Sequence, residues 1–334
     1  MKDRSRFSPP DATPTDPSGF TVIEMMVAMA VFLLLGSALA LFMNSSISAY
    51  RTNMARKKAY SSALSVLTIL GSDLENAFLA PGDRNPDVDV KFVCSREPNG
   101  CSKLVFVAFS PDPAADPDDR GLREIAWYTD GAAPPFRLLR AERVAVGGEH
   151  SLFASLSPDD GGTACDMVGY FALVFFPDAG ALTDEGSEVT PDQLRDGVPV
   201  WDSTRGILPD FPWKADDSAD DPWDDILPER VRVVLTVFPT FGMRAYLMED
   251  APAEATTLKV DTTEGFPPPG NDLESFVLVD SEWMRIVQVT GDSFTVERGA
   301  RGTSPAAHSS GAEVRAGYSF MKVVYIPCHG KAVR

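Results

Sequence analysis

Glu24 is the only formally charged residue in the apolar stretch from Phe20 to Met43. A carboxylate in hydrocarbon costs a few kcal/mol, so such a residue needs a partner or a function. The small pair Ser18-Gly19, which has the character of a cleavage site, lies directly before this stretch. If the chain is cut after Gly19, the new amine of Phe20 becomes a cation that can pair with Glu24 of the same or a neighbouring subunit. These residues therefore predict proteolytic processing followed by ion pairing inside an apolar assembly.

The uncharged run from Met25 to Met43 is long enough to cross a bilayer. At about 1.5 Å per helical residue it spans roughly 28 Å. A simple membrane anchor and an uncleaved signal sequence are the alternative interpretations. An ordinary secretory signal is cut after its apolar core, whereas the cleavage-like site here precedes it. The leader carries Lys2, Arg4 and Arg6 and several prolines, which argue against a helix there.

The stretch GFTVIEMMVAMAVFLLL resembles the class III signal of type IV prepilins and of type II secretion pseudopilins. The resemblance implies that a prepilin peptidase removes a leader, residues 1–19, by cutting between Gly19 and Phe20. It also implies N-methylation of Phe20 and a role for Glu24 in assembly. The expected location is the inner membrane, with a single-pass segment at residues 20–43 and a periplasmic globular domain, and then an extracellular pilus after assembly.

Other residues that could do chemistry form no enzyme motif. The sequence contains no HExxH, P-loop, GxSxG or dinucleotide-binding pattern. His150 and His329 lie in loop-like contexts without a Ser or Cys partner, and His308 and Arg301 lie in a turn-rich stretch. We therefore expect a protein that is not an enzyme and holds no cofactor.

The chain is strongly acidic, with a net charge of −18. This charge argues against nucleic-acid binding, which needs clustered Lys and Arg. The run KADDSADDPWDD could bind Ca²⁺ through the carboxylates of Asp216, Asp217, Asp220 and Asp221, because calcium prefers several oxygen ligands. The spacing does not match an EF-hand loop, so a solvated acidic loop is the favoured interpretation.

Four cysteines all lie beyond the apolar segment: Cys94, Cys101, Cys165 and Cys328. They form no CxxC pair, and the chain has only three histidines, so a zinc site is not predicted. An even count on the exported side of a membrane favours two disulfides. The turn-rich SREPNG between Cys94 and Cys101 suggests a small ring, with Cys165 bonded to Cys328, although four cysteines allow three connectivities.

A long helix must position the N-terminal residues. Beyond Met43, apolar residues recur at spacings of three, four and seven, which is the period of an amphipathic helix. The predicted stripe comprises Tyr60, Leu64, Leu67, Leu74 and Phe78, widened by Ala63, Leu70 and Ala77. We predict one helix over residues 20–80, ended by Pro81-Gly82. A basic patch of Arg51, Arg56, Lys57 and Lys58 either contacts an acidic neighbour or is a solvated face.

The remainder predicts an α+β fold, with the helix packed on an antiparallel sheet. Runs rich in β-branched and aromatic residues predict strands at 103–109, 123–129, 136–141, 168–176, 230–238 and 319–326. The globular β-domain covers 81–251, and a C-terminal strand at 317–334 completes it. Residues 252–316 have a different sequence pattern, which predicts short strands at 276–279, 283–289 and 293–297 and a Gly291-Asp292 turn. They resemble a small β-module of phage tail proteins and predict an insertion whose ends lie close together.

The stretch EIAWYTDGAAPPFRLLRAER resembles the strand-turn-strand of PilW-type minor pilins and J-type minor pseudopilins. The resemblance implies a type IV pilin-like fold. It implies a non-catalytic minor pilin that helps prime pilus assembly and sits in a tip complex. The partners would be other minor pilins and the major pilin through the N-terminal helix, with a tip adhesin as a further candidate. Two alternatives stay open: a minor pseudopilin of a type II secretion system, and a membrane-anchored adhesin that binds through the inserted module.

Overall fold

The computed structural model describes residues 21–79, 90–109, 121–144, 146–148, 151–177, 197–203, 226–327 and 330–331. The chain divides into two compact units, Met1–Arg51 and Thr52–Arg334. Helix α1 (Val22–Glu75) contributes its first part to one unit and its second part to the other. The helix ends before the predicted Pro81-Gly82 stop, because the chain turns to pair with the sheet. Ala77 forms a bridge with Ala108, and the Phe78 amide donates to the Val107 carbonyl at 2.8 Å.

The second part of α1 buries one face, but not quite the predicted one. Its buried residues are Ala55, Ala59, Ala63, Val66, Leu67, Leu70, Gly71, Asp73 and Leu74. Leu64 and Tyr60, which the sequence placed on this face, are 67% and 42% exposed. The prediction for Leu64 was wrong because Ala59 and Ala63, spaced four residues apart, face the sheet in its place. The Tyr60 ring is partly exposed but still packs edge-on against Tyr318 and Phe320 of the sheet.

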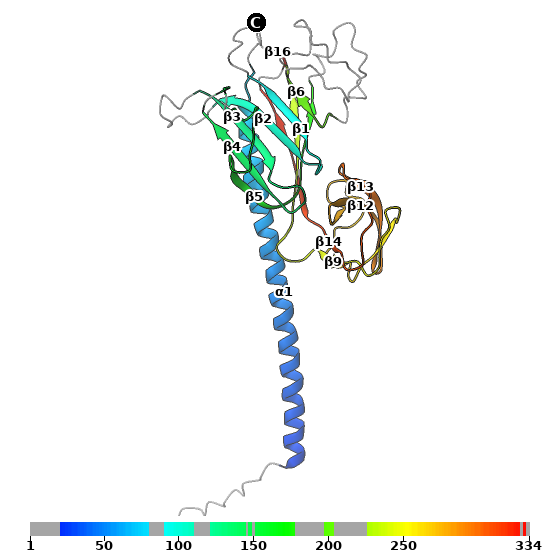
Figure 1. Ribbon diagram of the computed structural model, residues 1–334. Helices are drawn as coiled ribbons and strands as arrows, with labels where there is room; N and C mark the ends of the chain where they lie inside the picture. The colour runs from blue at the N-terminus through cyan, green and yellow to red at the C-terminus, as the bar shows by residue number, and fades with distance from the viewer. Residues whose placement is uncertain are drawn as a thin grey trace, which may run out of the picture. The chain divides into compact units, whose positions relative to one another are not determined.

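An eight-stranded antiparallel sheet forms the main body, in the order β15-β8-β5-β4-β3-β2-β1-β6 (Figure 1). The six longer strands confirm the predicted runs: β2 (Ser102–Phe109), β3 (Leu122–Thr129), β4 (Phe136–Arg143), β5 (Gly162–Phe176), β8 (Arg230–Val237) and β15 (Tyr318–Tyr325). The sequence missed the last two strands on one side of this sheet, β1 (Phe92–Arg96) and the edge strand β6 (Trp201–Asp202). It also missed the small pair β7 (Ile226–Leu227) and β16 (Gly330–Lys331).

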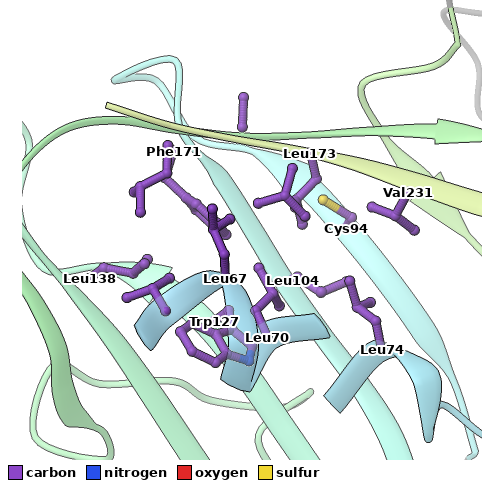
Figure 2. Packing of buried hydrophobic residues seen from close by; sticks show 14 of the residues in the cluster. Leu67, Leu70, Leu74, Cys94, Leu104, Trp127, Leu138, Phe171, Leu173 and Val231 are labelled. Atoms are coloured by element: carbon purple, nitrogen blue, oxygen red, sulfur yellow. The ribbon is translucent and has the colours of Figure 1, made fainter. Parts of the chain in front are cut away.

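The helix and sheet share one apolar core. Figure 2 shows Leu67, Leu70 and Leu74 of α1 among residues of the strands, including Leu104 and Trp127. All five side chains are buried, with at most 7% of their surface exposed. This packing confirms the α+β class and a long helix covering an antiparallel sheet.

A second, six-stranded sheet has the order β10-β13-β12-β11-β14-β9. Its strands are β9 (Arg244–Tyr246), β10 (Thr257–Lys259), β11 (Phe276–Val279), β12 (Glu282–Thr290), β13 (Ser293–Ala300) and β14 (Glu313–Arg315). The two edges meet, because Leu247 bridges Val260 and the Met248 amide donates to the Lys259 carbonyl at 2.9 Å. The sheet is therefore closed into a small barrel with an apolar core of its own.

The barrel is inserted between β8 and β15, which are neighbours in the main sheet. Val237 at the end of β8 pairs directly with Tyr318 at the start of β15, so the two ends of the insertion lie close together. The barrel begins earlier than the predicted boundary at Pro252, because β9 pairs with β14. The hairpin turn at Gly291 has the left-handed backbone (φ +54°) that suits glycine.

The predicted Cys94–Cys101 disulfide is not formed. Cys94, Cys101 and Cys165 are buried free thiols, and Cys328 lies outside the described residues. Cys94 pairs with Leu104 across the β1–β2 hairpin. Cys101 is three residues from Leu104 along the chain, which is about 10 Å at roughly 3.4 Å per strand residue. A disulfide needs Cα atoms within about 7 Å, so Cys94 and Cys101 are too far apart to form one. What was predicted as a cross-linked ring is an ordinary hairpin.

Candidate functional site: the start of the N-terminal helix

Helix α1 begins with a reciprocal cap between Thr21 and Glu24. The Thr21 amide and hydroxyl each donate to Glu24 Oε2 at 2.9 Å, and the Glu24 amide donates to Thr21 Oγ1 at 3.2 Å. This is a capping box, in which residues three apart satisfy the free donors of a helix start. The sequence signal for this cap is a Thr followed three residues later by Glu, directly before an apolar run.

The cap engages only one oxygen of the carboxylate. Glu24 Oε2 accepts both hydrogen bonds from Thr21, and Oε1 has no hydrogen-bond partner within the described residues. An ionised carboxylate can accept several hydrogen bonds, so Oε1 can still receive a donor from outside this segment. Gly19 and Phe20, the predicted processing residues, lie outside the described residues.

Glu24 lies beside a continuous row of apolar side chains along the helix. Ile23, Val27, Val31 and Leu35 follow one another at intervals of four residues, with Ala28 and Phe32 beside them. Every residue from Thr21 to Arg51 is exposed in the isolated chain. Among the described residues, α1 is the one helix that is long and apolar enough to cross a membrane. Such a surface needs either lipid or other apolar helices around it.

Part of the predicted basic patch is engaged within the globular unit. The Arg56 guanidinium lies 5.4 Å from the ring centre of Tyr60 and 5.7 Å from that of Tyr318 on β15. Lys57 and Lys58 are exposed. Arg56 therefore contributes to the packing between helix and sheet, and Arg51 is exposed like the two lysines.

His308 is buried in the barrel beside two carboxylates. Its Nδ1 lies 2.7 Å from Asp280 Oδ2, and its Nε2 lies 2.9 Å from Glu282 Oε2. Glu282 is also held by Arg298 Nε and Nη2, each at 2.8 Å. No local sequence pattern indicates this cluster, because the barrel fold brings together residues that are distant in the chain. Its members bond one another, so it serves the structure of the barrel.

The remaining predicted site residues fall on unplaced segments. His150, His329, Asp216, Asp217, Asp220 and Asp221 lie outside the described residues. Within the described ranges, no group of three His, Cys, Asp or Glu side chains is arranged to hold a metal ion. The calcium site therefore stays a prediction.

Comparison with known families finds a match at the N-terminal part of the chain. The family described as the prokaryotic N-terminal methylation motif matches residues 16–40, which include Thr21, Glu24 and the apolar row. No curated protein matches the chain. The motif is typical of non-enzymatic structural proteins and indicates a pilin-like or pseudopilin-like protein, and the apolar helix agrees with a membrane-anchored pilin.

Proposed function

We propose that this protein is a minor pilin that helps prime type IV pilus assembly and lies at or near the pilus tip. The observation that carries the proposal is the Thr21–Glu24 cap, which leaves Glu24 Oε1 open at the head of an exposed apolar row. The methylation motif covers the same residues. The mature chain would begin at Phe20 after prepilin peptidase cleaves after Gly19.

Assembly would then follow from helix packing. In the inner membrane, lipid covers the apolar row formed by Ile23, Val27 and Val31. In the filament, the helices of other minor pilins and of the major pilin would cover it. An N-terminal amine of Phe20 from a neighbouring subunit would donate to Glu24 Oε1, while Oε2 keeps the cap of its own helix. A buried charge pair of this kind fixes register, because a misplaced neighbour leaves both charges unpaired.

The globular body supports a minor rather than a major subunit. The stretch that resembles PilW-type minor pilins forms β3, the turn after it and β4, near the middle of the main sheet. The inserted barrel adds a second folded body that filament packing does not require. A subunit with such an addition fits best where fewer neighbours surround it, as at a tip.

The direct test compares Glu24→Ala with Glu75→Ala, which removes an exposed carboxylate from the other end of the same helix. Glu24→Ala should be processed normally but be absent from sheared pili, whereas Glu75→Ala should be incorporated like the wild type. Recovery of Glu24→Ala in sheared pili at the wild-type level would refute the proposal.

A minor pseudopilin of a type II secretion system is the second candidate, since the same motif marks both classes. Mass spectrometry of the N-terminal peptide separates them. A methylated Phe20 peptide in sheared surface filaments supports the pilin. The same peptide found only in membranes supports the pseudopilin, and an intact leader would favour an anchored binding protein.

If the protein is instead an adhesin, the barrel is the part that binds the target surface. The deletion that tests this must remove residues 243–316, because a cut at 252 would leave β9 without its partner β14. Pili that form normally but no longer attach would identify the barrel as the binding part. Loss of pili would place the barrel in the assembly interface.

A further inference from the structure

Arg301 reaches from the barrel into the main body of the protein. It lies just beyond β13 and has a left-handed backbone (φ +55°), which non-glycine residues rarely adopt. Its guanidinium lies 4.6 Å from the ring centre of Tyr170, which belongs to β5 of the main sheet. It also lies 4.2 Å from the ring centre of Phe276 and 4.4 Å from that of Trp283, both in the barrel. The cation is thus enclosed by rings from both bodies.

Polar contacts of Arg301 also cross between the two bodies. Its Nη2 donates to the Leu273 carbonyl of the barrel at 3.2 Å and to Ser319 Oγ of β15 at 3.3 Å. In return, Arg96 at the end of β1 donates to the Arg301 carbonyl at 3.2 Å and to the Tyr170 hydroxyl at 3.1 Å. Gly100 approaches so closely that a Cβ there would lie 2.7 Å from the Arg301 carbonyl oxygen.

An arginine is energetically unfavourable at position 301. Its Nη1 is buried without a hydrogen-bond partner, and burial lowers the pKa of its guanidinium to about 10. The turn itself would accept glycine more readily, as it does at the neighbouring Gly302 (φ +82°). Within the barrel, Arg301 contacts the rings of Phe276 and Trp283 and the Leu273 carbonyl. Its contacts with Tyr170 and Ser319 of the main sheet use its full length, planarity and charge.

We propose that Arg301 is the positioning residue that fixes the barrel to the main sheet, so that the two move as one rigid body. The stacked rings of Trp283 and Phe238, 5.9 Å apart and 11° from parallel, give the joint its apolar part. Arg301 gives it a single orientation, because the flat guanidinium fits between rings that come from both sides. A barrel held this way presents its surface at a fixed angle and passes any pulling force directly to β5 and β15.

The test measures the distance between two spin labels by pulsed electron paramagnetic resonance on the full chain in detergent. One label is attached at Ser95→Cys on β1 and the other at Lys259→Cys on β10, both exposed positions. Cys328 is replaced by Ser, and the three described native thiols are buried. The wild-type background should give one narrow distance distribution, and Arg301→Gly should give a broad one.

Two further variants make the outcome decisive. Tyr170→Leu removes the ring on the sheet side without altering the barrel, so it should broaden the distribution even if Arg301→Gly disturbs the barrel. Arg285→Ala is the control, since Arg285 is a barrel arginine whose ion pairs are with Asp272 and Glu297 of the same body. A broad distribution in the wild-type background, or narrow ones in both Arg301→Gly and Tyr170→Leu, would overturn the proposal.

Discussion

Asp73 of helix α1 and Arg140 of β4 form a two-bond ion pair between the helix and the sheet. Arg140 Nε donates to Asp73 Oδ2 at 2.8 Å, and Nη2 donates to Oδ1 at 2.9 Å. The indole of Trp127 donates to the same Oδ2 at 2.9 Å. Hydrogen bonding to Asp73 raises the pKa of Arg140. One buried carboxylate therefore fixes the rotation of the helix against two neighbouring strands.

Replacing Asp73 by Ala should destabilise the globular unit by about 2 kcal/mol, because Trp127 loses its acceptor and Arg140 keeps only Glu142 as a partner in a mostly buried site. Urea denaturation of the full chain in detergent measures this. The double variant Asp73→Leu/Arg140→Met should cost clearly less than the single change, since no charge is left unpaired. Equal costs for the two would show that the ion pair does not fix the helix.

Leu70 and Leu64 provide a matched test of the helix face that packs on the sheet. Leu70 is 0% exposed and Leu64 is 67% exposed, although both were predicted to be buried. Leu70→Ala should lower the free energy of unfolding by about 3 kcal/mol, as expected for a buried leucine, and Leu64→Ala by less than about 0.5 kcal/mol. Similar losses in the free energy of unfolding for the two variants would mean that Leu64 packs on the sheet, as the sequence predicted, and would contradict the structure.

The sequence predicts what local patterns control. The uncharged run before Met43 identified the apolar helix, and runs rich in β-branched and aromatic residues identified every strand of eight or more residues. Short strands such as β9 were missed, because three residues carry no period and their partner β14 is distant in the chain. The Asp73–Arg140 pair and the Glu282 cluster were missed for the same reason. Leu64 was misplaced because alanines, which carry little apolar signal, line the buried face.

Removing the hydroxyl of Thr21 should weaken assembly without abolishing it. Thr21→Val keeps the shape of the side chain but loses both hydroxyl bonds to Glu24, and the cap loses about 1 kcal/mol. Glu24 is then less well oriented, so the amount of subunit in sheared pili should fall between those of the wild type and Glu24→Ala. Thr21→Ser, which keeps the hydroxyl, should behave as the wild type. Incorporation of Thr21→Val at the wild-type level would show that the cap plays no part in assembly.

The buried cysteines should resist alkylation while the protein is folded. Burial raises the pKa of Cys94 to about 12 and those of Cys101 and Cys165 to about 11, so thiolate is scarce at pH 8. Iodoacetamide should leave these three residues unmodified in the native protein and modify all three in urea without a reductant. Failure to label Cys94 and Cys101 in urea until a reductant is added would instead establish the disulfide that the structure lacks.

Glu282 should make the barrel sensitive to acid. Burial alone would raise the pKa of Glu282, but hydrogen bonds from Arg298, the Ala306 amide, His308 and the Gly299 amide outweigh burial and lower it from 4.5 to about 2. A carboxyl group whose pKa is lowered on folding stabilises the fold at pH values above its unfolded-state pKa. This stability is lost as the pH falls from about 4.5 toward 2. The shift corresponds to about 3 kcal/mol.

The loss of barrel stability can be measured by oxidative footprinting of the buried Trp283 during urea unfolding, at pH 6, 4.5 and 3. In the wild type the urea midpoint should change little from pH 6 to 4.5 and fall clearly from pH 4.5 to 3. Glu282→Gln should already be destabilised at pH 6, because a neutral amide cannot pair with Arg298, and its midpoint should change little with pH. Glu297→Gln, which alters an exposed carboxylate of the same barrel, should follow the wild type. A wild-type midpoint that stays constant from pH 6 to 3 would mean that the Glu282–Arg298 pair does not hold the barrel together.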